Sequence, residues 1–348
     1  MKRIIYGLAC LLLILLLSVR STYGSVQISG KAAVMIDQNS GRILYEKNAH
    51  EPLLIASTVK VMTALLAIES GRLYDLVEID DNVLNAYGSG IYVSVGEEIL
   101  LIDLVYGLML RSGNDAALAI ANFVSGSEEK FVELMNQRAE ELELKDVIFT
   151  NPHGLDEKNQ NKVSAYNLAL IYKEAMNNEV FREISSTKEY TVKTDQKTYV
   201  WNNKNKLLRT YEYSTGGKTG FTKKAGRTLV TSAKKDELEL IVVTLNNGND
   251  FSDHKKMFEY GFKKYIAHEV INPRRLKVPK NKYSGKDLFI REAFVYPLTE
   301  DELDLVTTKI KLYKPKDVIG PKVGYVNIYK DDEKIGSIDI YKRKKDNP

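Results

Sequence analysis

Alternating apolar and polar residues mark the start of the folded chain. In "KAAVMIDQNSGRILYEKN", residues 31–48, they flank the turn formers Asn39, Ser40 and Gly41, which is typical of a β-hairpin. From Gly96 to Ser125, and again in "EKFVELMNQRAEELEL" and "SAYNLALIYKEAM", apolar residues recur at spacings of three and four. This spacing predicts a run of helices, interrupted at "RSGND" and at the Pro/Gly loop "NPHGLD".

Short β-type runs return after Lys188: "KEYTV", "KTYVW", "GRTLVTSA" and "ELELIVVTL". The helical pattern "DHKKMFEYGFKKYI" follows them. Beyond about Glu269 the chain is rich in strand patterns such as "LKVP", "DLFIREAFVYPL", "KIKLYK", "GYVNIYK" and "GSIDIYK", with "DDEK" as a hairpin turn. We therefore expect an α+β protein in which helices pack on one sheet beside a mostly helical lobe, followed by a small all-β domain.

The first 25 residues, "MKRIIYGLACLLLILLLSVRSTYGS", have a basic start and an apolar run from Ile4 to Val19. This pattern predicts an export signal. The run is slightly shorter than the ~20 residues that span a membrane, which favours cleavage near Gly24 over an uncleaved anchor. Cys10, the one cysteine, lies in the run, so the mature chain would have no disulfide or thiol chemistry. The predicted organisation is a signal peptide at 1–24, a catalytic domain at 25–268 and a β-rich domain at 269–348.

Composition narrows the classes of partner. The chain has 348 residues, 44% of them hydrophobic, and a net charge of +4, a size that suits about two domains. Three of the positive charges belong to residues 1–24, so the remainder is close to neutral at +1. This balance argues against nucleic acid as the partner. The basic tail "YKRKKDNP" is interpreted as a solvated end.

A serine and a lysine lie three residues apart in "LLIASTVKVMTALLAI", residues 53–68. On a helix, Ser57 and Lys60 share a face, with Ser57 at the positive, amide-rich start. The apolar run after Lys60 would bury the lysine and lower its pKa, which allows it to act as a base. The alternative is a capping serine with a surface lysine, because the same S-x-x-K pattern recurs at Ser127, Ser185, Ser232 and Ser252.

Two further patterns could carry chemistry. Ser112-Gly113-Asn114 is the only S-x-N in the chain and falls at a helix break, although such a triplet is also an ordinary turn. Lys218, Thr219 and Gly220 open the return to β structure in "GGKTGFT". The surrounding glycines let a strand lie close to a ligand, and a glycine-rich hairpin edge is the structural alternative.

Together, in the order S-x-x-K, S-x-N and K-T-G, these patterns resemble the signature of penicillin-interacting serine acyltransferases. "ASTVKVMTALL", "LMLRSGNDAALAIA", "NPHGLD" and "KTGFTKKAGRTLV" are similar to the low-molecular-mass penicillin-binding proteins, the serine-type D-alanyl-D-alanine carboxypeptidases. The resemblance runs from about Lys31 to Tyr265 and implies a β-lactamase/transpeptidase-like catalytic domain. The strand-rich tail resembles that family's C-terminal domain more loosely.

The resemblance implies catalytic roles for four residues. Ser57 would attack the carbonyl between the last two D-alanines of a peptidoglycan stem peptide, and Lys60 would take its proton. Ser112 and Asn114 would relay protons to the leaving group and hold the substrate backbone.

The resemblance also implies a substrate-binding strand. Lys218 and Thr219, followed by Gly220, would face the terminal carboxylate, and the backbone amides of Ser57 and Phe221 would form the oxyanion hole. β-Lactams would act as covalent inhibitors. We expect no cofactor and no metal, since no pair of the four histidines has metal-ligand spacing.

The chain departs from the family pattern at four positions. Gly217 precedes K-T-G where the family has a branched apolar residue, which predicts a looser strand. Asn161, Lys162 and Asn167 stand where the family often has a histidine and an aspartate. His153 belongs to the family-like loop and is interpreted as structural. The other histidines, which lie in polar sequence contexts, are His50, His254 and His268.

Alternatives to carboxypeptidase activity stay open. A β-lactamase often has an E-x-x-L-N loop, and the chain contains none. A D,D-endopeptidase or transpeptidase would carry the same motifs, as would a penicillin-binding wall module that turns over poorly. The final residues alternate like a strand rather than forming a membrane-anchoring helix. We therefore expect an exported protein on the outer face of the cytoplasmic membrane, in the wall or secreted, associated at most with the membrane surface or wall.

Overall fold

The computed structural model describes residues 26–156, 160–273, 278, 283 and 288–343. The predicted signal segment, including Cys10, lies outside these residues, as does most of "LKVP". In this described part, no helix is long and apolar enough to span a membrane.

A five-stranded antiparallel sheet forms the centre of the larger domain, with strand order β2-β1-β11-β10-β9. The hairpin expected within residues 31–48 is present as its first two strands. The strands "GRTLVTSA" and "ELELIVVTL" pair as a second hairpin across the turn at Asp236 and Glu237. The strands are β1 (Ala32–Asp37), β2 (Ile43–Lys47), β9 (Ser214–Thr222), β10 (Gly226–Lys235) and β11 (Leu238–Leu245).

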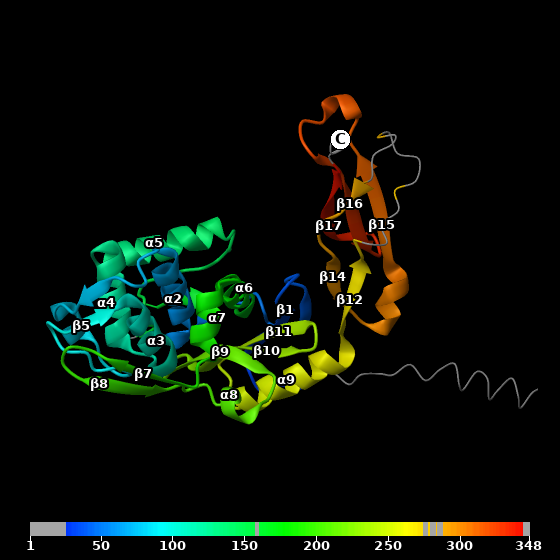
Figure 1. Ribbon diagram of the computed structural model, residues 1–348. Helices are drawn as coiled ribbons and strands as arrows, with labels where there is room; N and C mark the ends of the chain where they lie inside the picture. Colours follow the sequence, from blue (N-terminus) through cyan, green and yellow to red (C-terminus); the bar gives the residue numbers. More distant parts are fainter. Residues whose placement is uncertain (1–25, 157–159, 274–277, 279–282, 284–287, 344–348) are drawn as a thin grey trace, which may run out of the picture.

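Helices cover both faces of this sheet (Figure 1). Val34 and Ile36 of β1 belong to the larger core, with the helical lobe. Ala33 and Met35, which point the other way, pack with Phe258 of the last helix. The helices expected from the sequence are confirmed as α2 (Lys60–Glu69), α3 (Leu101–Arg111), α4 (Asn114–Ser125), α5 (Glu128–Glu141), α6 (Ala165–Met176) and α9 (Asp250–Lys264). Two short helices were not predicted, α7 (Glu179–Ser186) and α8 (Leu207–Thr210).

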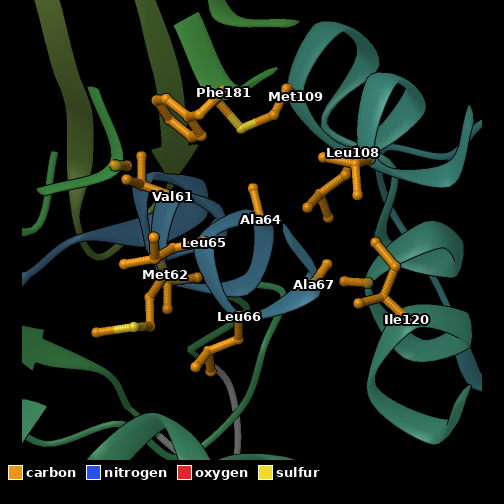
Figure 2. Packing of buried hydrophobic residues seen from close by; sticks show 14 of the residues in the cluster. Val61, Met62, Ala64, Leu65, Leu66, Ala67, Leu108, Met109, Ile120 and Phe181 are labelled. Carbon is orange, nitrogen blue, oxygen red and sulfur yellow. The ribbon is translucent and has the colours of Figure 1, made fainter. Parts of the chain in front are cut away.

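Helix α2 runs through the interior of the helical lobe. Every residue from Lys60 to Ile68 is buried, which is the pattern of a helix enclosed on all sides. Figure 2 shows Ala64 and Ala67 of α2 facing Leu108 of α3 and Ile120 of α4. Small residues on this face allow the neighbouring helices to approach closely, so a lysine at the helix start has no route to bulk solvent except through the cleft described below.

Three two-stranded ribbons lie outside the central sheet. "KEYTV" and "KTYVW" are strands as expected, but they pair only with each other in the described structure and do not extend the main sheet. Their tyrosines and Trp201 pack against α3. The ribbons are β3 (Leu53–Leu54) with β6 (Lys162–Val163), β4 (Leu76–Glu78) with β5 (Glu98–Leu100), and β7 (Glu189–Lys193) with β8 (Thr198–Asn202).

A second, all-β region follows α9 and stands away from the helical lobe (Figure 1). It has its own core around Val326, Ile328 and Ile340. The boundary predicted at residue 268 falls inside β12 and stays a prediction. The region contains a sheet of order β13-β17-β16-β15 and a ribbon β12-β14, formed by β12 (Ile266–Ile271), β13 (Leu288–Phe289), β14 (Phe294–Leu298), β15 (Val306–Leu312), β16 (Lys322–Lys330) and β17 (Glu333–Lys342).

His254 lies in the core although its sequence context is polar. It is fully buried on α9 between the hydroxyls of Thr231 and Thr244. Burial lowers the pKa of His254 to about 3, against a weaker opposing effect of Asp253. The ring is therefore neutral at ordinary pH and satisfies two buried hydroxyls.

Arg42, just before β2, joins the two regions. Its guanidinium donates to both carboxylate oxygens of Glu302 and to the carbonyl of Pro297, and lies over the rings of Tyr265 and Tyr296. Burial alone would raise the pKa of Glu302, but the hydrogen bonds from Arg42 outweigh it and lower the pKa to about 2. Bidentate pairs of this kind are among the stronger ionic contacts in proteins.

We expect Glu302→Gln to weaken the attachment of the β region by about 2 kcal/mol at pH 7, because it replaces charge-assisted hydrogen bonds. The folded-state pKa lies below the ordinary value of 4.5, so the contribution is complete above that value and is lost as pH falls toward about 2. Urea unfolding followed by circular dichroism would show a difference between wild type and variant at pH 7 that shrinks at pH 3. Equal differences at both pH values would contradict this assignment.

Candidate active site

A cleft of about 510 Å³ opens where β9 meets the start of α2 and the junction of α3 and α4. Of the residues predicted from the sequence, Ser57, Ser112, Thr219, Gly220 and Phe221 line it. The other three are buried: Lys60 contacts Ser57, Lys218 contacts Ser112, and Asn114 contacts Lys60. The structure thus brings the three sequence patterns together in one place, although they are separated by up to about 160 residues in the chain.

Ser57 lies in a 3-10 turn, η1 (Ala56–Val59), and the α-helix begins only at Lys60. Ser57 thus stands at the start of the helical segment, as the sequence indicates, with its first turn in 3-10 rather than α geometry. Ala56 has a left-handed backbone, with φ of 47°, a conformation that is strained for a residue with a side chain. Such strain at the residue before a reactive group is a common feature of functional sites.

The amine of Lys60 has three neighbours. Its Nζ lies 3.2 Å from Oγ of Ser57, 2.7 Å from Oδ1 of Asn114 and within hydrogen-bond distance of the His153 carbonyl. Two of these groups can only accept a hydrogen bond, and the third is a hydroxyl. A neutral amine has two N–H donors and one lone pair, so it satisfies both acceptors and leaves the lone pair facing Ser57.

Burial lowers the pKa of Lys60 well below 10.5, and the nearby charge of Lys204 adds to the effect while Asp115 opposes it. The side chain has no exposed surface, which confirms the burial expected from the apolar run. The lowered pKa agrees with the donor count in favouring the neutral amine over the ammonium form.

Ser112 and Asn114 stand at the break between α3 and α4. Ser112 ends α3 with φ of 63°, and this left-handed turn redirects the chain so that α4 starts at Asn114. The amide of Asn114 accepts from Lys60 and donates to the carbonyl of Tyr87. The triplet is therefore a turn, as its composition suggests, whose polar groups also face the cleft.

Lys218 is a second buried amine. It donates to Oγ of Ser112 at 3.0 Å and to the carbonyl of Thr219 at 2.7 Å. Burial lowers the pKa of Lys218 well below 10.5, and the neighbouring amines of Lys60 and Lys204 lower it further. Ser57 and Ser112 thus each contact a buried lysine.

Glycines bring β9 close to its neighbours. A Cβ on Gly220 would lie 2.3 Å from Oγ1 of Thr228 and 3.0 Å from the amide nitrogen of Ser57. A Cβ on Gly217 would lie 2.6 Å from the Val230 carbonyl. Gly217 is buried and its amide donates to Ser185, so the looser strand expected from this departure is wrong: the site has no room for a branched residue.

The departures at Asn161 and Asn167 have structural roles. Oδ1 of Asn161 accepts from the amides of Thr150 and Asn151, and its Nδ2 donates to the Asn151 carbonyl. Asn167 donates to the carbonyl of Lys145. These bonds hold the "NPHGLD" loop, whose His153 carbonyl reaches Lys60. Lys162, in contrast, is exposed on β6.

Two groups near the site were missed by the sequence analysis. The His153 carbonyl acts through backbone, so no side-chain pattern could reveal it. Lys204 lines the cleft and donates to Oγ of Ser89 at 2.9 Å; only its place between two asparagines in "NNKNK" marks it. Among the described residues, no group of histidines, cysteines and carboxylates could hold a metal ion.

Comparison with known proteins assigns the chain to a family. A family model described as D-alanyl-D-alanine carboxypeptidase matches residues 19–249. The chain belongs to this family. The D-alanyl-D-alanine carboxypeptidase DacF of Bacillus subtilis is 34% identical over 87% of this chain and 82% of its own length. DacA of Escherichia coli is 35% identical over 74% of this chain and 65% of its own length.

Solved structures of the family share the fold over nearly the whole chain. Penicillin binding protein 5 of Haemophilus influenzae has a TM-score of 0.77 at 26% identity and covers 92% of this chain and 98% of its own. Penicillin binding protein 6B of Escherichia coli has a TM-score of 0.72 over the same shares, at 26% identity. The expected fold class, a transpeptidase-like domain followed by a β-rich C-terminal domain, is confirmed.

We expect Lys60→Met to flatten the pH dependence of stability. Folding lowers the pKa of Lys60. Between that lowered value and about 10.5, the unfolded chain therefore binds more protons than the folded chain. The free energy of unfolding rises with pH in this window as a result. The variant would lose up to about 1.4 kcal/mol per pH unit of that slope. Urea unfolding from pH 7 to 10 measures it. Lys255→Met, at an exposed position, is the control, and an unchanged slope in Lys60→Met would refute a neutral buried amine.

Proposed function

We propose that the protein is a serine-type D-alanyl-D-alanine carboxypeptidase, a hydrolase that removes the terminal D-alanine from peptidoglycan stem peptides. The observation that carries this proposal is the arrangement around Lys60, whose buried Nζ lies within hydrogen-bond distance of Oγ of Ser57, Oδ1 of Asn114 and the His153 carbonyl. Family membership supports the choice of substrate.

Acylation starts with transfer of the Ser57 hydroxyl proton to Lys60. The oxygen then attacks the carbonyl carbon of the penultimate D-alanine and forms a tetrahedral intermediate. The amides of Ser57 and Phe221 are proposed to stabilise its oxyanion, where the loss of one donor typically costs ~10² to 10³ in rate. The Gly220 contact supports this role for Ser57, because it holds the strand against that amide.

Collapse of the intermediate breaks the peptide bond. The leaving amine takes a proton that returns from Lys60, and Ser112 and Asn114 are proposed to relay it and to hold the substrate backbone. The products are free D-alanine and an ester on Ser57. Water then attacks the ester and gives a proton to Lys60, which passes it to the Ser57 oxygen as the ester bond breaks and the shortened peptide leaves.

The terminal carboxylate is proposed to bind at Lys218 and Thr219, next to Gly220. An arriving carboxylate offsets the desolvation that lowers the pKa of Lys218, so binding favours the ammonium form. β-Lactams, which carry a carboxylate beside a reactive amide, would acylate Ser57 by the same route.

We expect Ser57→Ala to abolish release of D-alanine from a short acyl-Lys-D-Ala-D-Ala peptide, because no nucleophile remains. Ser252→Ala is a matched control: Ser252 also stands three residues before a lysine but is exposed. The assay measures free D-alanine and labelling by a fluorescent penicillin. Release that persists in Ser57→Ala would contradict the proposed nucleophile.

We expect Lys60→Arg to lower both D-alanine release and penicillin labelling by ~10² to 10⁴, since the guanidinium does not lose its proton at working pH. The two assays separate acylation from hydrolysis of the ester. If labelling kept its wild-type rate, Lys60 would not be the base for acylation.

A transpeptidase or D,D-endopeptidase is the second candidate, favoured by similarity to a mutant of a Streptomyces DD-transpeptidase, with a TM-score of 0.66 at 29% identity over 69% of this chain. The difference lies in whether water or an amine accepts the acyl group. Adding glycine to the peptide assay distinguishes them: a new peptide bond indicates transfer, and free tetrapeptide alone indicates hydrolysis. Labelling without either product would indicate a poorly turning-over binding module.

We also propose that the protein is exported and works outside the cytoplasmic membrane, where peptidoglycan lies. The support is the basic and apolar start of the sequence, residues 2–19. Mass spectrometry of the mature N-terminus tests cleavage near Gly24, and cell fractionation distinguishes membrane, wall and medium.

A further inference from the structure

Arg227 lines the cleft from β10, the strand next to β9. It stands directly opposite Phe221 of β9, and Thr219 is its diagonal neighbour two residues along that strand. Opposite residues on paired strands share a face of the sheet, and successive residues alternate between faces. Arg227, Phe221 and Thr219 therefore lie on one face, whereas Lys218 and Gly220 lie on the other. The Arg227 side chain thus starts on the same face as the Thr219 hydroxyl, at a diagonal spacing that a long side chain can reach.

A buried carboxylate holds Arg227 in place. The side chain of Asp250, the first residue of α9, is 7% exposed, and its Oδ2 accepts from Nε of Arg227 at 3.0 Å. Its Oδ1 accepts from the amide of Phe251 at 2.8 Å, so each oxygen of the carboxylate has a partner. The Arg227 side chain is itself 46% exposed. Asp250 therefore holds the guanidinium at the surface of the cleft without burying it.

The contact with Asp250 uses only one of the three nitrogens of the guanidinium. Nε is the donor, and in the described part of the chain neither terminal nitrogen of Arg227 has a hydrogen-bond partner. A guanidinium carries five N–H donors in a planar fork, and parallel donors from its two terminal nitrogens match the two oxygens of a carboxylate. It also keeps its charge at working pH. Arg227 therefore presents to the cleft a charged edge that can bind a carboxylate.

Two lysines at the cleft already have partners. Lys218 is buried, and its Nζ donates to Oγ of Ser112 and to the carbonyl of Thr219. Lys204 donates to Oγ of Ser89. A carboxylate that approaches either amine competes with these contacts. Among the described residues, nothing competes in this way for the terminal nitrogens of the guanidinium on β10.

We propose that Arg227 recognises the free carboxylate at the C-terminus of the substrate and distinguishes it from a C-terminal amide. This inference rests on the proposed function, in which Ser57 attacks the carbonyl one residue before that carboxylate. The carboxylate then lies beside Thr219, where the diagonal neighbour Arg227 can bind both of its oxygens. An amide at the same place has one oxygen and no charge, so it lacks the ionic, bidentate contact.

Ligand binding tests this recognition without turnover, in a Ser57→Ala background. The ligands are an acyl-Lys-D-Ala-D-Ala peptide and the same peptide with a C-terminal amide. NMR titration at about 150 mM salt, where exposed charges are screened, gives their dissociation constants. We expect the acid to bind more tightly than the amide. Adding Arg227→Met should weaken binding of the acid about tenfold, because charge-assisted hydrogen bonds are lost, and leave binding of the amide unchanged.

Lys206→Met is the matched control. Lys206 is an exposed cation that also lines the cleft, but it lies outside β9 and β10, so its loss should leave both dissociation constants unchanged. Arg227→Lys keeps the charge and lacks the planar fork, and we expect it to weaken binding of the acid to an intermediate degree. This variant also decides the question if circular dichroism shows that Arg227→Met does not fold.

Four results would overturn the inference: no binding of the acid, no preference for the acid over the amide, equal losses in Arg227→Met and Lys206→Met, or a loss in Arg227→Met that is the same for both ligands. The last result would indicate a structural role only. Release of D-alanine is measured separately, with Ser57 intact. If release is absent while the preference for the acid depends on Arg227, the proposed reaction fails and the recognition of the carboxylate stands.

Discussion

The site depends on holding one amine out of water. Lys60 is fully buried at the start of an interior helix, where a charged ammonium would be strongly disfavoured. Its three neighbours come from three separate segments: the 3-10 turn with Ser57, the start of α4 and the loop at His153. The amine is therefore satisfied only when all three segments are in place. Burial of the Lys60 amine opposes folding at neutral pH, and the same burial lowers its pKa so that it can act as a base. This is the usual conflict between stability and activity.

Close approach of backbones assembles these segments. A Cβ on Gly154 would lie 2.2 Å from the Ala56 carbonyl, and a Cβ on Gly220 would lie 3.0 Å from the amide nitrogen of Ser57. The loop, the turn and β9 thus pack backbone to backbone, with no side chain between them. This packing explains why Gly217 replaces a larger residue without loosening the strand: the neighbouring β10 and Asn205 already fill the space.

Sequence patterns predicted the parts of the structure that depend on local order. Periodicity revealed the first hairpin and most helices, and the apolar run after Lys60 predicted its burial. The three polar patterns could be placed in one cleft only through the family resemblance, because nothing local says that Lys218 reaches Ser112. Contacts through backbone, such as the His153 carbonyl, leave no side-chain signal. The burial of His254 could not be read from its charged sequence neighbours, because burial on a helix depends on the face and not on adjacent residues.

All the groups proposed to react lie in the larger domain, and the C-terminal sheet belongs to a separate region with its own core. Arg42 links the regions through a buried ion pair with Glu302 and two tyrosine rings. A bidentate pair fixes direction as well as distance, so it restricts how the sheet is oriented relative to the cleft. If the two regions were joined only by a mobile linker, a partner bound to the C-terminal sheet would not fix the direction in which the cleft faces. The Arg42–Glu302 pair restricts the angle between the regions, so a partner bound to the sheet would also orient the cleft.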